Sequence, residues 1–174
     1  MVSFIIHNVK PCSINKGYYK TRKVLTVDGR RYRKRLLCTI NDNQLIIDQI
    51  NKLTSKFDPE KHALKVQYYF YMPKKVIYLK GKGAMSRLGG DVDNLIKLTT
   101  DFLFNPKYMG HVFPNVDKPT QIVNFNIDDQ FIADIRAYKL PSVHEYHSIG
   151  VKAHIVNKKP KKHPSFDLKE IFKK

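Results

Sequence analysis

The stretch from Asp91 to Phe104, DVDNLIKLTTDFLF, decides the fold class. Its apolar residues Leu95, Leu98 and Phe102 recur at helical spacing, so we expect a helix with this side facing the core. The segments on both sides read as strands. His62–Met72 is rich in Tyr, Phe and Val, and residues 147–156 alternate apolar and polar side chains. A helix between two strands indicates a domain that mixes both element types.

Further outward, the same reasoning predicts the remaining elements. Val2, Phe4 and Ile6 alternate with their neighbours as in an opening strand. Two helices should follow, one capped by Asp28 and the other over residues 42–53. Shorter strands are expected over residues 75–79 and 135–140, the second preceded by a helical turn within 125–134. The prediction is a single α+β domain, residues 1–157, whose mixed sheet has flanking helices, followed by a basic C-terminal tail, residues 158–174. The order does not alternate regularly enough for a doubly wound parallel sheet.

The charge of the chain indicates a polyanionic partner. There are 32 Lys and Arg against 15 Asp and Glu, a formal net charge of +17. Such a field concentrates polyanions at the surface, and nucleic acid is the leading class. Solubility and attraction to an anionic membrane are the alternative explanations. Basic residues crowd one segment, Arg30, Arg31, Arg33, Lys34 and Arg35. The residues that we predict to contact DNA are Lys20, Arg22, Lys23, Arg30, Arg31, Arg33, Lys34 and Arg87.

Other sequence features indicate where the protein acts. Cys12 and Cys38 are the only cysteines and lack a C-x-x-C spacing, so we expect two reduced thiols and no zinc site. No apolar run is long enough to span a membrane, and residues 1–9 do not resemble a secretory signal. We therefore expect a cytoplasmic or nucleoid protein with no membrane partner.

The acidic residues form the most informative pattern. Asp91 and Asp93 stand where the predicted helix begins, and Lys97 and Asp101 follow Asp93 at spacings of four, on the same helical face. A purely structural explanation is available: Asp91 caps the helix, and Asp93 pairs with Lys97.

The adjacent pair Asp128–Asp129 favours a chemical explanation instead. If these acids fold beside Asp91 and Asp93, four carboxylates would repel one another strongly, unless a divalent cation neutralises them. Oxygen ligands select Mg²⁺, with Mn²⁺ as a substitute. The metal could activate water and stabilise charge on a scissile phosphate. Lys97 would then be a second cation near the phosphate, or would orient the attacking water.

The arrangement D-x-D-N-x-x-K-x-x-x-D-x-L followed by D-D resembles the RusA family of Holliday junction resolvases. Here it comprises Asp91, Asp93, Asn94, Lys97, Asp101, Leu103, Asp128 and Asp129. The N-terminal part is also similar to a family pattern, P-x-S-x-N-x-x-Y-Y followed by basic residues and G-x-x-Y-R. Its matches are Pro11, Ser13, Asn15, Tyr18, Tyr19, Gly29, Tyr32 and Arg33. The resemblance covers roughly residues 3–156.

The resemblance implies a dimeric, Mg²⁺-dependent nuclease that nicks four-way DNA junctions symmetrically, without a small-molecule cofactor, in a bacterial or phage-infected cell. Asp91, Asp93 and Asp129 match catalytic acids, Lys97 matches an essential lysine, and Asp128 matches a supporting acid. All four acids are candidate metal ligands. The chain departs from the family in a longer segment between Asp101 and Asp128, in residues 87–90 before the first acid, and in the tail. These departures bear on sequence preference and junction contacts.

Two other functions fit the same residues. A non-catalytic nucleic-acid-binding protein, of architectural or ribosomal type, would explain the charge but has no use for four acids facing a phosphate backbone. A nuclease that acts on flaps or single strands would use the same acid cluster. The sequence does not distinguish between these substrate shapes.

Overall fold

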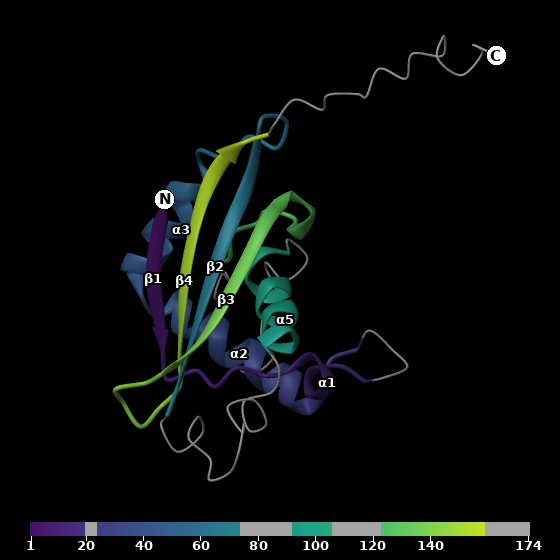
Figure 1. Ribbon diagram of the computed structural model, residues 1–174, viewed down its shortest axis with the longest axis vertical. Helices are drawn as coiled ribbons and strands as arrows, with labels where there is room; N and C mark the ends of the chain where they lie inside the picture. The colour runs from purple at the N-terminus through teal and green to yellow at the C-terminus, as the bar shows by residue number, and fades with distance from the viewer. Residues whose placement is uncertain (20–23, 74–91, 106–122, 159–174) are drawn as a thin grey trace, which may run out of the picture.

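A four-stranded mixed sheet forms the frame of the protein (Figure 1). The computed structural model describes residues 1–19, 24–73, 92–105 and 123–158. The strands are β1 (Val2–His7), β2 (His62–Met72), β3 (Ile132–Pro141) and β4 (Ser148–Asn157), in the order β1-β4-β2-β3. β4 pairs antiparallel with both β1 and β2, whereas β2 and β3 are parallel.

The parallel pair determines the position of the helix that carries the acidic motif. Parallel neighbours need a long crossover connection, usually helical, because the chain must return to the same end of the sheet. The connection from β2 to β3 contains α5 (Val92–Phe104), which packs against β3. The acidic motif is therefore part of a strand–helix–strand unit, and Asp128–Asp129 stand immediately before the second strand of that unit.

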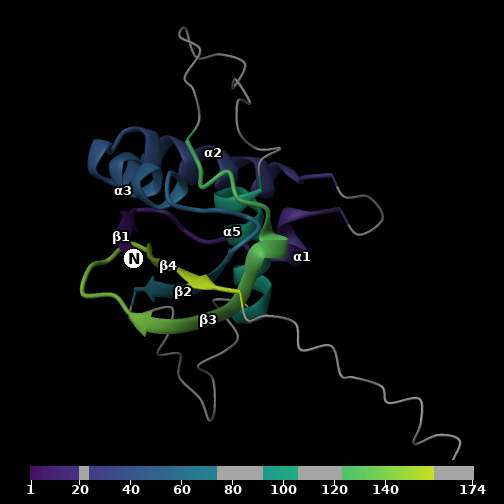
Figure 2. The ribbon, with the colours of Figure 1, turned by 90° about the horizontal axis from the view of Figure 1, so that it is seen from above.

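The helices cover one face of the sheet. α1 (Ile14–Gly17), α2 (Val27–Asn41), α3 (Gln44–Thr54) and α5 lie together on one side in Figure 2. β1 and β2 alternate accordingly: in β2, Leu64, Val66, Tyr68, Phe70 and Met72 are buried beneath the helices. The core is continuous across sheet and helices. The opposite face of the sheet has no covering layer among the described residues.

These findings confirm the predicted α+β class with a mixed sheet in one domain. The predicted strand His62–Met72 has the observed bounds, and the helix of the acidic motif begins at Val92. The last strand is shifted by only one residue, because its alternation is regular. The predicted strand 75–79 and all but Lys158 of the basic tail lie outside the described residues.

One local prediction was wrong. α2 is capped by Thr26 and not by Asp28, because the Thr26 hydroxyl accepts the Gly29 N–H at 3.1 Å. The chain before Tyr18 forms the short helix α1, which was not predicted. Both cysteines are free thiols. None of the described helices combines the length and the apolar character that crossing a membrane requires.

Candidate active site between α5 and β3

The C-terminal end of α5 fixes the segment that carries the second pair of acids. A helix leaves its last carbonyls without intrahelical partners. Here the N–H groups of Phe125 and Ile127 bond to the carbonyls of Leu103 and Phe104 at 2.8 and 3.1 Å. The Phe104 and Phe125 rings stack with centroids 4.5 Å apart. The chain that follows therefore emerges beside α5, and it leads directly to Asp128 and Asp129.

Lys97 makes ion pairs with two of the acids, Asp101 and Asp129. Its Nζ lies 2.7 Å from Asp101 Oδ1 and 3.3 Å from Asp129 Oδ2. Lys97 makes no ion pair with Asp93, although both belong to the described part of the chain, so the structural explanation based on that pair is wrong. Lys97 therefore joins Asp129 to Asp101. The predicted neighbours of Asp129 were Asp91 and Asp93, and Asp91 lies outside the described residues.

A hollow of about 280 Å³ opens between α5 and β3 at this point. Its polar lining includes Asp93, Lys97, Thr100 and Asp129, and the apolar side chains of Ile96 and Ile135 form the remainder. Asp93 is exposed, whereas Asp129 is partly buried. Two carboxylates and one ammonium group from segments more than 30 residues apart thus share one cavity.

The other two predicted acids have different positions. Asp128 caps the 3₁₀ helix η2 (Asp129–Phe131), with its Oδ1 accepting the Gln130 N–H at 3.0 Å. It does not line the hollow. Asp91 precedes α5 directly but lies outside the described residues.

Asp101 is buried beside Lys97, and its contact with Tyr18 was not indicated by the sequence. Its side chain is 9% exposed, and the carboxylate accepts hydrogen bonds from Lys97 and from Tyr18, whose hydroxyl is 3.1 Å from Oδ2. A buried carboxylate is costly unless both oxygens are satisfied. Asp101 therefore holds Lys97 in place from beneath, while the Lys97 ammonium faces the hollow.

The N-terminal motif supports α5 from its other side. The Tyr32 hydroxyl lies 2.7 Å from Thr99 Oγ1 in the core, and Thr99 gives its one proton to the Leu95 carbonyl, so Tyr32 is the donor. Burial is the largest cause that raises the pKa of Tyr32, which keeps this hydroxyl protonated. Together with Tyr18, it joins the N-terminal segments to the helix that carries the acids.

Two glycines allow this contact. A Cβ on Gly29 would lie 2.2 Å from the Gly17 carbonyl oxygen, and a Cβ on Gly17 would lie 2.4 Å from Leu98 Cδ2. α1, α2 and α5 meet here more closely than side chains would permit. The tyrosine–glycine pattern is visible in the sequence, but its contact with α5 is not.

Electrostatics keeps Lys97 cationic. Partial burial acts to lower the pKa of Lys97, but the hydrogen bond and charge of Asp101, together with Asp129, outweigh it and raise the pKa above its ordinary value. A raised lysine pKa makes this side chain a poor proton acceptor near neutral pH. Its chemistry in the hollow is that of a fixed positive charge and hydrogen-bond donor.

Four basic residues of α2 are exposed, namely Arg30, Arg31, Lys34 and Arg35. Arg30 donates to the Leu25 carbonyl at 2.8 Å, and Arg33 is half-buried. Lys34 is exposed, and Arg31 lies 3.9 Å from Asp28. The other predicted DNA contacts, Lys20, Arg22, Lys23 and Arg87, lie outside the described residues.

The donor set of the hollow is compatible with a hard divalent cation. Asp93 and Asp129 offer carboxylate oxygens, the ligands that Mg²⁺ prefers, and no histidine or cysteine lines the cavity among the described residues. In residues 1–19, 24–73, 92–105 and 123–158, no three His, Cys, Asp or Glu side chains are grouped to hold a metal. The predicted set needs Asp91 as its third acid.

Comparison with known proteins does not assign the chain to a family. No protein-family model matches the sequence, and no curated protein matches it.

Proposed function

We propose that the protein is a Mg²⁺-dependent endonuclease that cuts branched DNA, with four-way junctions as its preferred substrate. The observation that carries the proposal is the convergence of Asp93, Lys97 and Asp129 on one hollow in a chain of net charge +17. A surface that only bound DNA would gain nothing from carboxylates at this place, because they repel phosphate. The proposed relationship to the RusA family rests on the sequence motif.

The proposed metal ligands are Asp91, Asp93 and Asp129, with Asp128 holding the turn that presents Asp129. When bound, Mg²⁺ would supply a Lewis acid that activates water and neutralises charge on the scissile phosphate. Asp101 and Tyr18 keep Lys97 directed at the hollow. The Lys97 ammonium would hold a phosphate oxygen by a charge-assisted hydrogen bond and add a second positive charge beside the reacting group.

The experiment that tests the function compares substrates. The purified full-length chain is incubated with a four-way junction, a flap and a linear duplex of the same sequences, with Mg²⁺, with Mn²⁺ or with a chelator. We expect paired nicks in the junction that need the metal, and little cleavage of the duplex. Tight binding of all three DNAs without cleavage under any metal condition would favour the non-catalytic binding protein. Cleavage of the flap alone would support metal-dependent cleavage but show that the substrate is a flap and not a four-way junction.

We also propose that the working form is a homodimer. A four-way junction has two-fold symmetry, and the acidic motif occurs once in the chain, so two copies are needed to nick two opposed strands in one binding event. β4 lies inside the sheet between β1 and β2, so its backbone is already paired. A partner could contact β4 only through side chains on its open face.

A further inference from the structure

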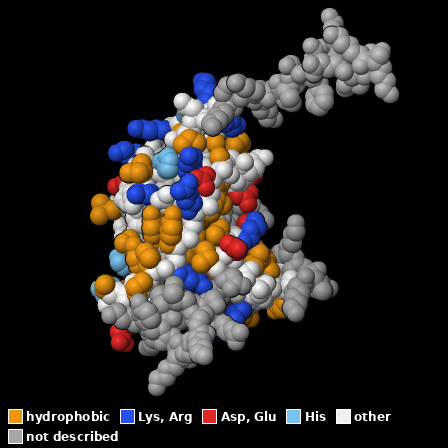
Figure 3. Space-filling model, in the orientation of Figure 1, with side chains coloured by type: hydrophobic (Ala, Val, Ile, Leu, Met, Phe, Trp, Pro, Cys, Tyr) orange, Lys and Arg blue, Asp and Glu red, His pale blue; other side chains and the backbone are white. Residues whose placement is uncertain are grey.

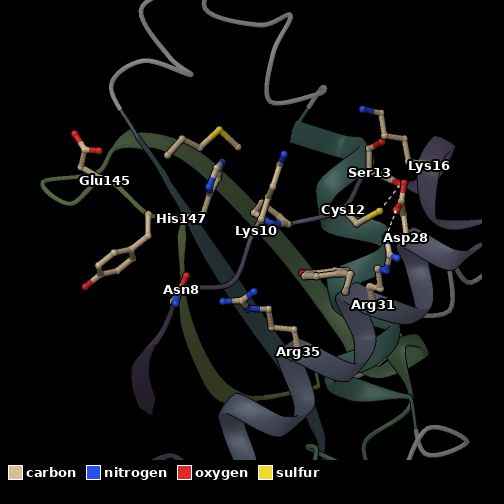
Figure 4. Close-up of a pocket in the computed structure, with 14 residues that line it drawn as sticks. Asn8, Lys10, Cys12, Ser13, Lys16, Asp28, Arg31, Arg35, Glu145 and His147 are labelled. Carbon is tan, nitrogen blue, oxygen red and sulfur yellow. Dashed lines mark hydrogen bonds and ion pairs between the residues drawn. The ribbon is translucent and has the colours of Figure 1, made fainter.

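A second and larger hollow lies away from the acids. It measures about 640 Å³ and is bounded by the segment after β1, by one face of α2 and by the residues that lead into β4 (Figure 4). Asp28, Arg31, Tyr32 and Arg35 are spaced at three, four and seven residues, so one side of α2 faces it. Cavities of this size commonly hold small molecules or single groups of larger ones.

Positive charge dominates the lining. Four cationic side chains and two carboxylates line the hollow. The cations are Lys10, Lys16, Arg31 and Arg35, and the carboxylates are those of Asp28 and Glu145. Within the described residues, Lys10, Lys16 and Arg35 make no ion pair. Figure 4 shows Arg35 extending from α2 toward the segment that carries Lys10.

His147 also lines this hollow. Its pKa is lowered, first by burial and second by the positive charge of Lys10. The pKa of Cys12 is raised, first by burial and second by the charge of Asp28, while Lys16 and Lys10 act in the opposite direction. Cations gathered in a concave surface favour an anionic ligand, and phosphate groups suit both lysine and arginine.

The two hollows lie at different levels along the sheet, one beside the middle of β2 and the other at its end. The acidic hollow includes Ile135, which pairs with Val66 of β2, whereas the basic hollow includes Met72, the last residue of β2. The interval is 72 − 66 = 6 residues along the strand, which corresponds to roughly 20 Å at about 3.3 Å per residue.

We propose that the basic hollow between Lys10, Lys16 and Arg35 binds the phosphate backbone of one DNA arm, apart from the phosphate at the acidic hollow. The inference rests on the proposed function, because it assigns the same DNA a second contact. In this proposal the acidic hollow cleaves the DNA, and the basic hollow binds it. The arm binds through phosphates, so this contact is independent of base sequence.

The test uses the double variant Lys10→Ala/Arg35→Ala in the full-length chain. Removing two contacts to phosphate should lower the salt slope of junction binding by about 1.8, which corresponds to roughly 30-fold weaker binding at 0.15 M salt when affinity at 1 M is unchanged. Lys52→Ala/Lys56→Ala removes the same charge at exposed positions around the end of α3 and should change affinity little.

Cys12 provides a readout that does not depend on cleavage. It lines the basic hollow, and Cys38→Ser leaves it as the only thiol. Bound junction DNA should slow alkylation of Cys12, and the protection should disappear in the Lys10→Ala/Arg35→Ala background. If DNA binds and is cut while Cys12 stays unprotected and the double variant binds as the control does, the basic hollow is not the second contact and the proposed function stands. If no DNA binds at all, both proposals fail.

Discussion

At the residue scale, Lys97 combines a structural and a chemical role, and a paired substitution can separate them. Lys97→Met alone leaves the buried Asp101 carboxylate with Tyr18 as its one hydrogen-bond partner among the described residues, and should lower the free energy of unfolding by about 1–3 kcal/mol. Lys97→Met/Asp101→Asn removes both charges and should recover most of that stability. Urea unfolding measures the first effect.

Cleavage should not recover in the same double variant, because the fixed positive charge beside the proposed metal site is still missing. Single-turnover cleavage of a four-way junction checks this, with Asp101→Asn alone as the control that retains Lys97. A double variant that cut junctions at the wild-type rate would reduce Lys97 to a structural residue.

At the element scale, the contact between α1 and α2 holds the N-terminal motif against α5. Gly29→Ala places a methyl group 2.2 Å from the backbone oxygen of Gly17, which can move only if α1 moves. An alanine would otherwise favour the helix by about 1 kcal/mol, but a forced shift in a close-packed region costs about 1–3 kcal/mol. We expect a net loss of stability and weaker cleavage, because Tyr18 moves with α1.

Gly17→Ala is the matched control for this prediction. Its methyl group meets the end of the Leu98 side chain, which can change rotamer, so the loss should be smaller. Thermal unfolding of both variants ranks them. Equal stability of Gly29→Ala and the wild type would show that the contact between the two helices is not tight.

The same elements show which parts of the structure the sequence can predict. β2 and α5 follow from local periodicity, and both were predicted within one residue. Periodicity identifies the buried side of an element but not its neighbour. The sheet order, the parallel pairing of β2 and β3, and the bond between Tyr18 and Asp101 depend on contacts between distant segments. The basic hollow was missed for the same reason, since Lys10 and Arg35 come together only in the fold.

At the scale of the whole molecule, the open face of the sheet is the surface available for a second copy. A row of residues crosses it from Ile5 to Gly150, Tyr69 and Tyr138. Ile5 and Tyr138 are 43% and 42% exposed, and the Tyr69 and Tyr138 rings stack. Figure 3 shows hydrophobic side chains over the middle of this face. Two chains of +17 repel each other, so association should strengthen as salt screens them.

The corresponding variant is Ile5→Lys/Tyr138→Lys, which adds two charges to the row. Light scattering across protein and salt concentration should find a wild-type dimer and a monomeric variant. Leu45→Lys/Val143→Lys adds the same charge at two other exposed apolar positions and should remain dimeric. A wild-type chain that stays monomeric while making paired nicks in one binding event would overturn the dimer.

In the proposed function, the hollow between α5 and β3 is the place where DNA is cut. The most direct measurement is single-turnover cleavage of a four-way junction in Mg²⁺, with binding recorded in parallel, for Asp129→Asn and Asp134→Asn. Each variant removes one carboxylate, either just before β3 or near its beginning. Asp129 contacts Lys97 at the hollow, whereas Asp134 pairs with Arg136. We predict that Asp129→Asn binds the junction at least as tightly as the wild type and fails to cut it, while Asp134→Asn cuts normally. Cleavage by Asp129→Asn at the wild-type rate would contradict the assignment of the active site.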